Sequence, residues 1–139
     1  MDKKIVVFKL GNQLWGIDLK YIREVVRVKQ YTKVPSATDH VLGVFNLRGQ
    51  IVPLLDISRI LNVERDSSET AIILNYNDEA VGFSVDSVVG VISISDKEVL
   101  PPPTEAGDYV KSVVRRGKEL ISVLDTARVL EVIEHAGIT

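Results

Sequence analysis

Short apolar runs, separated by polar turn residues, follow one another along the chain. Ile5–Leu10 is rich in β-branched and aromatic residues, and the turn-forming residues Gly11 to Gln13 follow it. An extended pattern resumes over Leu14–Val28, within which Asp18–Ile22 fits either a strand or a short helical turn. Strands this short, with turns between them, predict a mainly β protein.

The segment Val44–Leu61 predicts a β-hairpin followed by a helical turn. Asn46 to Gly49 carry the turn signal, and Gln50–Leu55 is expected to be a strand. Asp56 then stands where a helix N-cap is expected, before a short amphipathic turn. The preceding segment Lys29–Leu42 has weak periodicity and several loop-forming residues, so it predicts mainly a loop.

The pattern of the first half starts again at Thr70. Gly82 takes the place in the second half that Gly16 has in the first, each inside an apolar run. The pair Leu124-Asp125 likewise repeats Leu55-Asp56 before a helical pattern, at a slightly longer offset. The three additional residues fall in a longer connection that contains three consecutive prolines. The sequence therefore predicts two copies of an all-β unit of roughly 65 residues.

Each unit is too small to bury much surface alone. The two lobes, approximately residues 1–66 and 67–139, are therefore expected to share a core within one domain. Small barrels that close their own sheet edges suit strands of this length. The pattern leaves open an exchange of strands, in which the chain ends complete each other's barrels.

Composition and charge narrow the class of protein. The chain has 139 residues, of which 45% are hydrophobic and 26% charged, and its formal net charge is −2. This balance is typical of a folded globular protein and provides no bulk attraction to nucleic acid or anionic lipid. Cysteine is absent, which excludes disulfides and thiolate chemistry. With neither a signal peptide nor a run of about 18 apolar residues, a cytoplasmic protein is expected.

Candidate catalytic and metal-binding residues have simpler explanations. Asp56 and Asp125 could suggest an acid–base pair, but each precedes a helical turn at equivalent repeat positions, so N-capping accounts for both. His40 and His135 lie in a loop and a tail without further ligand residues beside them. The sequence therefore predicts no enzyme, no cofactor and no metal site.

Arg48 is the strongest candidate for a binding residue. Its guanidinium is presented beside Gly49 on an otherwise apolar unit. By chemistry alone, docking of a partner and structural pairing with a carboxylate such as that of Glu24 are equally supported.

Three blocks of sequence resemble the CheW-like domain family of bacterial chemotaxis. They are Tyr21 to Val25, Gly43 to Asp56 and Gly82 to Val88, which follow one another in the family's order, and the resemblance extends over nearly the whole chain. The Asn-Leu-Arg-Gly turn followed by Val-Pro is the most specific part. Phe45, where smaller residues are common, and the short tails are mild departures.

The resemblance implies a fold, a function and two sets of contact residues. The fold would be two SH3-like five-stranded β-barrels, related by the internal repeat and packed around a shared core. The function would be that of a non-enzymatic adaptor that couples chemoreceptor cytoplasmic tips to the histidine kinase CheA. Family positions implicated in receptor binding correspond to Ile22, Glu24, Gly43, Arg48, Thr70, Ala71 and Ile72. A kinase-binding surface is assigned more loosely to Val91 and Ser93.

The resemblance also implies recruitment of a cytoplasmic protein to membrane-associated receptor arrays, and assembly into arrays or rings. One alternative keeps the fold but places the adaptor in a different kinase pathway, such as surface motility. A small-barrel RNA-binding module is another alternative, suggested by the basic residues Lys111, Arg115, Arg116 and Lys118. Neither the net charge nor an aromatic stacking platform supports it, so no nucleic-acid partner and no membrane insertion are expected.

Overall fold

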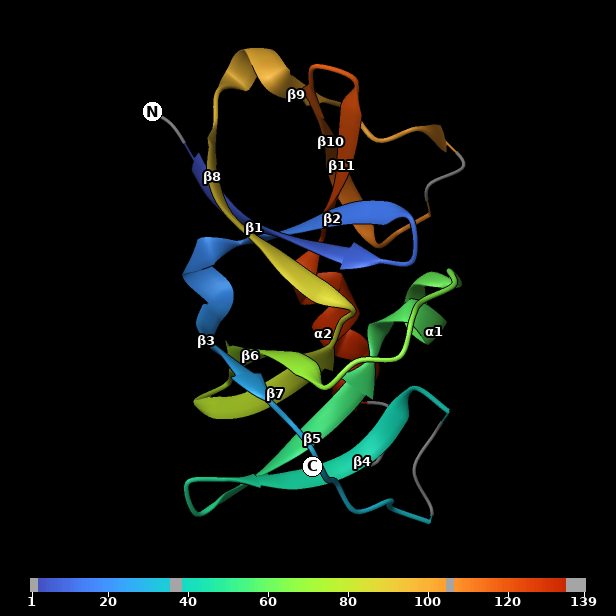
Figure 1. Cartoon of the computed structure of the whole chain (residues 1–139). Coiled ribbons are helices and arrows are strands. Elements are labelled where there is room, and N and C mark those ends of the chain that lie inside the picture. Colours follow the sequence, from blue (N-terminus) through green and yellow to red (C-terminus); the bar gives the residue numbers. More distant parts are fainter. Residues whose placement is uncertain (1–2, 36–38, 105–106, 135–139) are drawn as a thin grey trace.

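The computed structural model describes residues 3–35, 39–104 and 107–134 and consists of two β-sheets with short helices (Figure 1). Residues 36–38 of the predicted loop and His135 lie outside these residues. The elements in chain order are β1 Lys3–Leu10, β2 Gln13–Asp18, 3₁₀ helix η1 Leu19–Tyr21, β3 Ile22–Arg27, β4 Val41–Leu47, β5 Gln50–Asp56, α1 Ile57–Leu61, β6 Thr70–Tyr76, β7 Glu79–Ser84, β8 Ser87–Ile94, 3₁₀ helix η2 Asp96–Glu98, β9 Val99–Leu100, β10 Val110–Arg116, β11 Glu119–Leu124 and α2 Thr126–Glu134. The predicted mainly β fold is confirmed.

Each sheet combines strands from both halves of the sequence. The six-stranded sheet has the order β8-β1-β2-β11-β10-β9, and the five-stranded sheet has the order β3-β6-β7-β5-β4. The hairpin β1–β2 is thus joined to strands of the second half, and the hairpin β6–β7 to strands of the first. In Figure 1 the two sheets lie one above the other, with α1 and α2 near the level where they meet.

The internal repeat extends to the pairing register. Val25 on β3 pairs with Ile72 on β6, and their counterparts in the repeat, Val91 on β8 and Val6 on β1, pair with each other. A bulge interrupts both pairs of strands at equivalent positions. Both sheets also contain one parallel pair, β5 with β7 and β11 with β2. The two halves therefore have the same local structure and exchange hairpins.

Capping side chains begin the helices as predicted. The Asp56 carboxylate accepts a hydrogen bond from the backbone N–H of Ser58 (3.2 Å), and Asp125 accepts one from the N–H of Arg128 (3.3 Å). The ambiguous stretch between β2 and β3 is a 3₁₀ helix, whose N-cap Asp18 accepts from the N–H of Lys20 (3.1 Å). The loop predicted over Lys29–Leu42 was wrong in its last two residues, because β4 already begins at Val41, which pairs with β5.

The core has one shared part and one part in each sheet. The largest cluster contains Phe8 and Trp15 of one sheet together with Leu55 and Phe83 of the other. A second cluster lies in the five-stranded sheet and a third in the six-stranded sheet. The predicted packing around a shared core is confirmed.

Candidate functional site

Arg48 lies at the tip of the β4–β5 hairpin in a strained backbone conformation. Its φ is 50° and that of Gly49 is 89°, so both residues occupy the left-handed region. The side chain of Asn46 accepts a hydrogen bond from the N–H of Gly49 (2.8 Å), which stabilises the turn. At the equivalent place in the β10–β11 hairpin stands Gly117, with a φ of 62°. A large side chain thus occupies a position where the other repeat has glycine.

The guanidinium of Arg48 donates a hydrogen bond to the carboxylate of Glu24 and forms an ion pair with it. This bond to Glu24 raises the pKa of Arg48 above its ordinary value. The pairing anticipated from chemistry alone is therefore present. The Arg48 side chain remains 66% exposed, whereas that of Glu24 is 27% exposed. The pair joins the hairpin tip to β3 and still presents a cation at the surface.

Strand β3 has one sheltered face and one exposed face. Ile22, Glu24 and Val26 are partly buried, while Arg23 and Val25 are exposed. Glu24 therefore shares its face with two aliphatic side chains, as predicted from the alternation. The site combines this mixed apolar and acidic face with the basic tip of the neighbouring hairpin.

The remaining predicted receptor-binding residues have more interior positions. Ala71 and Ile72 are buried on β6, which pairs with β3, and Thr70 at the start of β6 is partly buried. Gly43 is buried on β4, and a Cβ there would overlap the carbonyl oxygen of Thr32. Of the predicted set, Ile22, Glu24, Arg48 and Thr70 are the residues whose side chains reach the surface.

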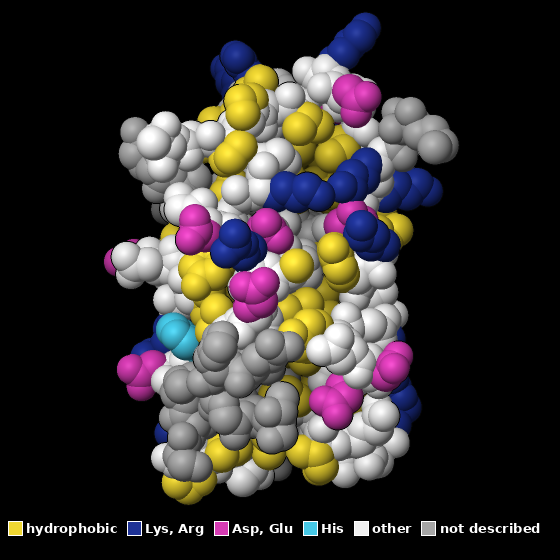
Figure 2. All heavy atoms as spheres, turned by 180° about the vertical axis from the view of Figure 1, so that it is seen from behind, with side chains coloured by type: hydrophobic (Ala, Val, Ile, Leu, Met, Phe, Trp, Pro, Cys, Tyr) yellow, Lys and Arg dark blue, Asp and Glu magenta, His cyan; other side chains and the backbone are white. Residues whose placement is uncertain are grey.

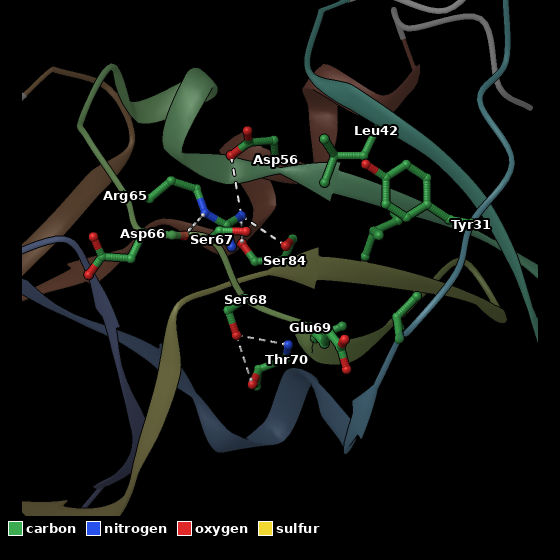
Figure 3. Close-up of a pocket in the computed structure, with 13 residues that line it drawn as sticks. Tyr31, Leu42, Asp56, Arg65, Asp66, Ser67, Ser68, Glu69, Thr70 and Ser84 are labelled. Atoms are coloured by element: carbon green, nitrogen blue, oxygen red, sulfur yellow. Dashed lines mark hydrogen bonds and ion pairs between the residues drawn. The ribbon is translucent and has the colours of Figure 1, made fainter.

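Two hollows flank the segment that enters β6. One, of about 440 Å³, is lined by residues of β3 and by Ser68, Glu69 and Thr70. The other, of about 330 Å³, is lined by the same three residues, by Tyr31 and Leu42, and by a polar group around Arg65. Figure 3 shows Arg65 directed toward Asp56 and Ser84, with Tyr31 and Leu42 at the opposite side. Residues 62–69 are rich in charged residues, which is typical of a solvated linker, so no signal in the sequence singles out Arg65.

A second surface lies on β8, at the edge of the six-stranded sheet. Val91 is 55% exposed and Ser93 is exposed on the same face. A guanidinium nitrogen of Arg116 donates to the backbone carbonyl of Ser93 (2.6 Å) and to Glu98 (3.2 Å). The hydrogen bond from Arg116 lowers the pKa of Glu98 to about 2. The two residues assigned to kinase binding therefore lie together, on the other sheet from the Arg48 site.

The basic residues that suggested nucleic-acid binding do not form a uniform basic face. Arg116 pairs with Glu98, and Lys111 lies near Lys3, whose ammonium is 3.1 Å from the carboxylate of Asp18. Repulsion from Lys3 lowers the pKa of Lys111. Figure 2, which views the molecule from behind, shows acidic and apolar side chains among the Lys and Arg side chains of the visible face.

Within residues 3–35, 39–104 and 107–134, no group of three or more His, Cys, Asp or Glu side chains could hold a metal ion. No helix in the described part of the chain is long and apolar enough to cross a membrane. Among the described residues, the two predicted binding regions are an exposed Arg–Glu pair on one sheet and an apolar strand edge on the other.

This combination defines a small β protein with two interlocked sheets, with an exposed Arg–Glu ion pair on one sheet and exposed apolar side chains at the edge of the other. The family model of the CheW-like domain matches residues 4–134. This chain belongs to the CheW-like domain family.

Individual relatives agree with this assignment. The chemotaxis protein CheW of Treponema pallidum is 33% identical over 133 residues, which is 88% of this chain and 78% of the relative. The chemotaxis protein CheW of Thermotoga maritima is 30% identical over 132 residues, covering 92% of this chain and 87% of the relative. The crystal structure of the scaffolding protein TtCheW from Thermoanaerobacter tengcongensis superposes with a TM-score of 0.82 at 31% identity, covering 90% of each chain.

Proposed function

We propose that this protein is a non-catalytic chemotaxis adaptor that couples chemoreceptor cytoplasmic tips to the histidine kinase CheA. The observation that carries the proposal is the Arg48–Glu24 pair. Arg48 has a left-handed conformation that glycine would adopt without strain, and its guanidinium stays mostly exposed. Strained backbone at a surface residue is typical of functional positions.

The receptor-binding surface would consist of this pair together with Ile22 and Thr70. Ala71 and Ile72 are buried, so they would contribute by shaping β6 rather than by direct contact. Gly43 would act in the same indirect way, by allowing Thr32 to pack against β4. A receptor hairpin would thus meet a cation beside a partly apolar strand, a mixture common at the centres of protein interfaces.

The kinase-binding surface would be the edge of β8 around Val91 and Ser93. Val89 is also exposed there, so this edge presents apolar area. A strand at the edge of a sheet with exposed apolar side chains can pack against a partner protein. Because the two surfaces lie on different sheets, one molecule would hold both partners in a cytoplasmic array next to the membrane, without inserting into it and with no cofactor.

The first experiment measures both interactions by titration calorimetry. Arg48→Glu is expected to weaken binding to a receptor-tip fragment by about tenfold or more and to leave binding to the CheA regulatory domain unchanged. Arg128→Glu on α2 makes the same charge change at an exposed position outside both surfaces and serves as the control. Loss of kinase binding in Arg48→Glu would move this residue to the kinase surface, and a wild type that binds neither partner would refute the proposal.

The β8 surface is tested by a pair of substitutions at equivalent repeat positions. Val91→Lys is expected to weaken binding to the CheA regulatory domain by about tenfold or more, because it places an unpaired charge in an apolar contact. Val25→Lys introduces the same change on β3, where Val25 is 46% exposed. Kinase binding that is lost in Val25→Lys and kept in Val91→Lys would assign the kinase to the other sheet.

A further inference from the structure

Arg65 is a largely buried cation in the connection between the two halves. Its side chain is 14% exposed, and one guanidinium nitrogen donates to the backbone carbonyl (3.1 Å) and to the hydroxyl (2.8 Å) of Ser84. The same nitrogen lies 3.6 Å from the carboxylate of Asp56. The Nε atom lies 3.3 Å from the carboxylate of Asp86. Arg65 thus contacts α1's N-cap, the end of β7 and the turn before β8.

Asp86 connects this group to the other sheet. Its Oδ2 atom accepts hydrogen bonds from the N–H of Gly11 (2.6 Å), in the β1–β2 turn, and from the N–H of Asp66 (2.8 Å). Its Oδ1 atom is buried and has no hydrogen-bond partner, so the charge of Arg65 Nε is what balances it. A buried carboxylate of this kind depends on its cation. The ion pair with Arg65 therefore holds the Asp86 side chain in place, and that side chain in turn holds the backbone of Asp66.

The segment that follows, residues 66–70, forms a wall beside the two hollows, and Ser68 to Thr70 line both of them. At its far end, backbone bonds hold it: Val28 donates to the carbonyl of Glu69 (2.7 Å), and Val85 donates to that of Thr70 (3.0 Å). At its near end, the Asp86 side chain holds Asp66. The position of the wall beside β3 is therefore set at one end by these backbone hydrogen bonds and at the other by Asp86, which is paired with Arg65.

We propose that Arg65, paired with Asp86 and Asp56, is a positioning residue for the receptor-binding surface. It keeps Ser68 to Thr70 at a fixed distance from the strand that carries Glu24, and the receptor hairpin packs against both. The proposal rests on the proposed function for the identity of the partner. Arginine suits this role because its planar fork reaches several acceptors in fixed directions, whereas lysine supplies only a point charge.

The test compares three variants by binding and by melting temperature. Arg65→Gln removes the charge, and Arg65→Lys keeps the charge but loses the fork. Arg59→Gln is the matched control, because Arg59 also lies 3.6 Å from Asp56 but is exposed and contacts it from α1. Arg65→Gln is expected to weaken receptor-tip binding by about tenfold, with kinase binding changed less than about twofold. Arg65→Lys should restore part of the receptor affinity, and Arg59→Gln should behave as wild type.

Equal weakening of both interactions in Arg65→Gln, in step with a lower melting temperature, would mean that Arg65 only stabilises the fold and would overturn the proposal. If Arg65→Gln proves too unstable to study, unchanged receptor affinity in the folded Arg65→Lys variant would overturn it as well.

Hydrogen exchange separates failure of this proposal from failure of the proposed function. The amide of Asp66 reports the end of the wall that the Asp86 side chain holds, and it should exchange faster in Arg65→Gln than in Arg59→Gln. The amide of Val28 reports the end that backbone bonds hold and serves as the reference. This result is expected even if the wild type binds no receptor tip, in which case only the partner assignment fails. Unchanged exchange at Asp66 would refute the positioning role, and so would faster exchange at Asp66 with unchanged receptor affinity.

Discussion

At the scale of single residues, the two hairpin tips differ in one informative way. Gly117 adopts the left-handed conformation without steric cost, whereas Arg48 adopts the same conformation with a full side chain. The ion pair with Glu24 is exposed to solvent, where such pairs contribute little to stability. The small contribution of this pair to stability therefore supports the proposed receptor-binding role of Arg48 over a purely structural one.

Replacing Arg48 with glycine separates these two roles. Arg48→Gly is expected to melt at the same temperature as the wild type or higher, because glycine relieves the backbone strain, while binding to the receptor-tip fragment falls by about tenfold or more. Thermal unfolding followed by circular dichroism, with calorimetric titration, checks both. A marked drop in melting temperature would identify the Arg48–Glu24 pair as a structural element.

Gly43 differs from Arg48, because its surroundings in the fold explain why glycine stands there, without any binding partner. Gly43→Ala is expected to lower the free energy of unfolding by roughly 1–3 kcal/mol, because the new methyl group must displace the segment around Thr32. Urea titration measures the change. Normal stability combined with lost receptor affinity would instead place Gly43 in direct contact with the receptor.

At the scale of elements, the Arg116–Glu98 pair links β10 to η2 and gives a pH-dependent stability. The pKa of Glu98 is lowered to about 2 from its usual value near 4.5, so the folded state favours the ionised carboxylate. The stabilisation is therefore complete above pH 4.5 and is lost as the pH falls through about 2.

Arg116→Gln should accordingly melt at a lower temperature than the wild type at pH 6, and the difference should shrink as the pH falls from 4.5 to 2, leaving the part due to the Ser93 carbonyl. Thermal scans across this range provide the measurement, with Arg115→Gln as the exposed neighbouring control. A difference that does not shrink over this range would show that the Arg116–Glu98 pair does not contribute to the stability.

The sequence predicted the individual strands and helix N-caps more fully than it predicted which strands lie beside one another. Turn residues and alternation located the hairpins and the N-caps at Asp56 and Asp125, and the repeat offsets matched equivalent strands. The start of β4 at Val41 was missed because loop-forming residues precede it. Alternation within a strand does not encode which strand lies beside it, so the order of the sheets required the structure.

The candidate site was also predicted only in part, because the sequence does not show which distant residues the fold brings together. The pairing of Arg48 with Glu24 followed from complementary charge and from the face that Glu24 shares with Ile22. Arg65 was not identified, because a basic residue among acidic neighbours in a linker gives the same pattern as a solvated loop. The ion pairs with Asp56 and Asp86 distinguish Arg65 from a residue of a solvated loop. The sequence does not show them, because the whole β6–β7 hairpin separates Arg65 from Asp86 along the chain.

At the scale of the whole molecule, the shared core makes the two sheets one cooperative unit. Leu55 and Leu124, at equivalent repeat positions, are 1% and 2% exposed in the same cluster. Replacing either by alanine is expected to lower the free energy of unfolding by about 2–5 kcal/mol. Both variants should unfold in urea in one transition with an unchanged m-value. A near-neutral effect or a second transition would contradict a shared core.

The exchanged hairpins also bear on the ancestry of the fold. Two separate copies of the repeating unit that traded hairpins in this way would form a symmetric, domain-swapped homodimer. The present chain has the geometry of such a dimer whose subunits have been joined by residues 62–69. A homodimer must carry every substitution twice, whereas a fused pair can change one copy alone. In a fused pair, one hairpin tip can hold glycine while the other holds arginine, as Gly117 and Arg48 do here.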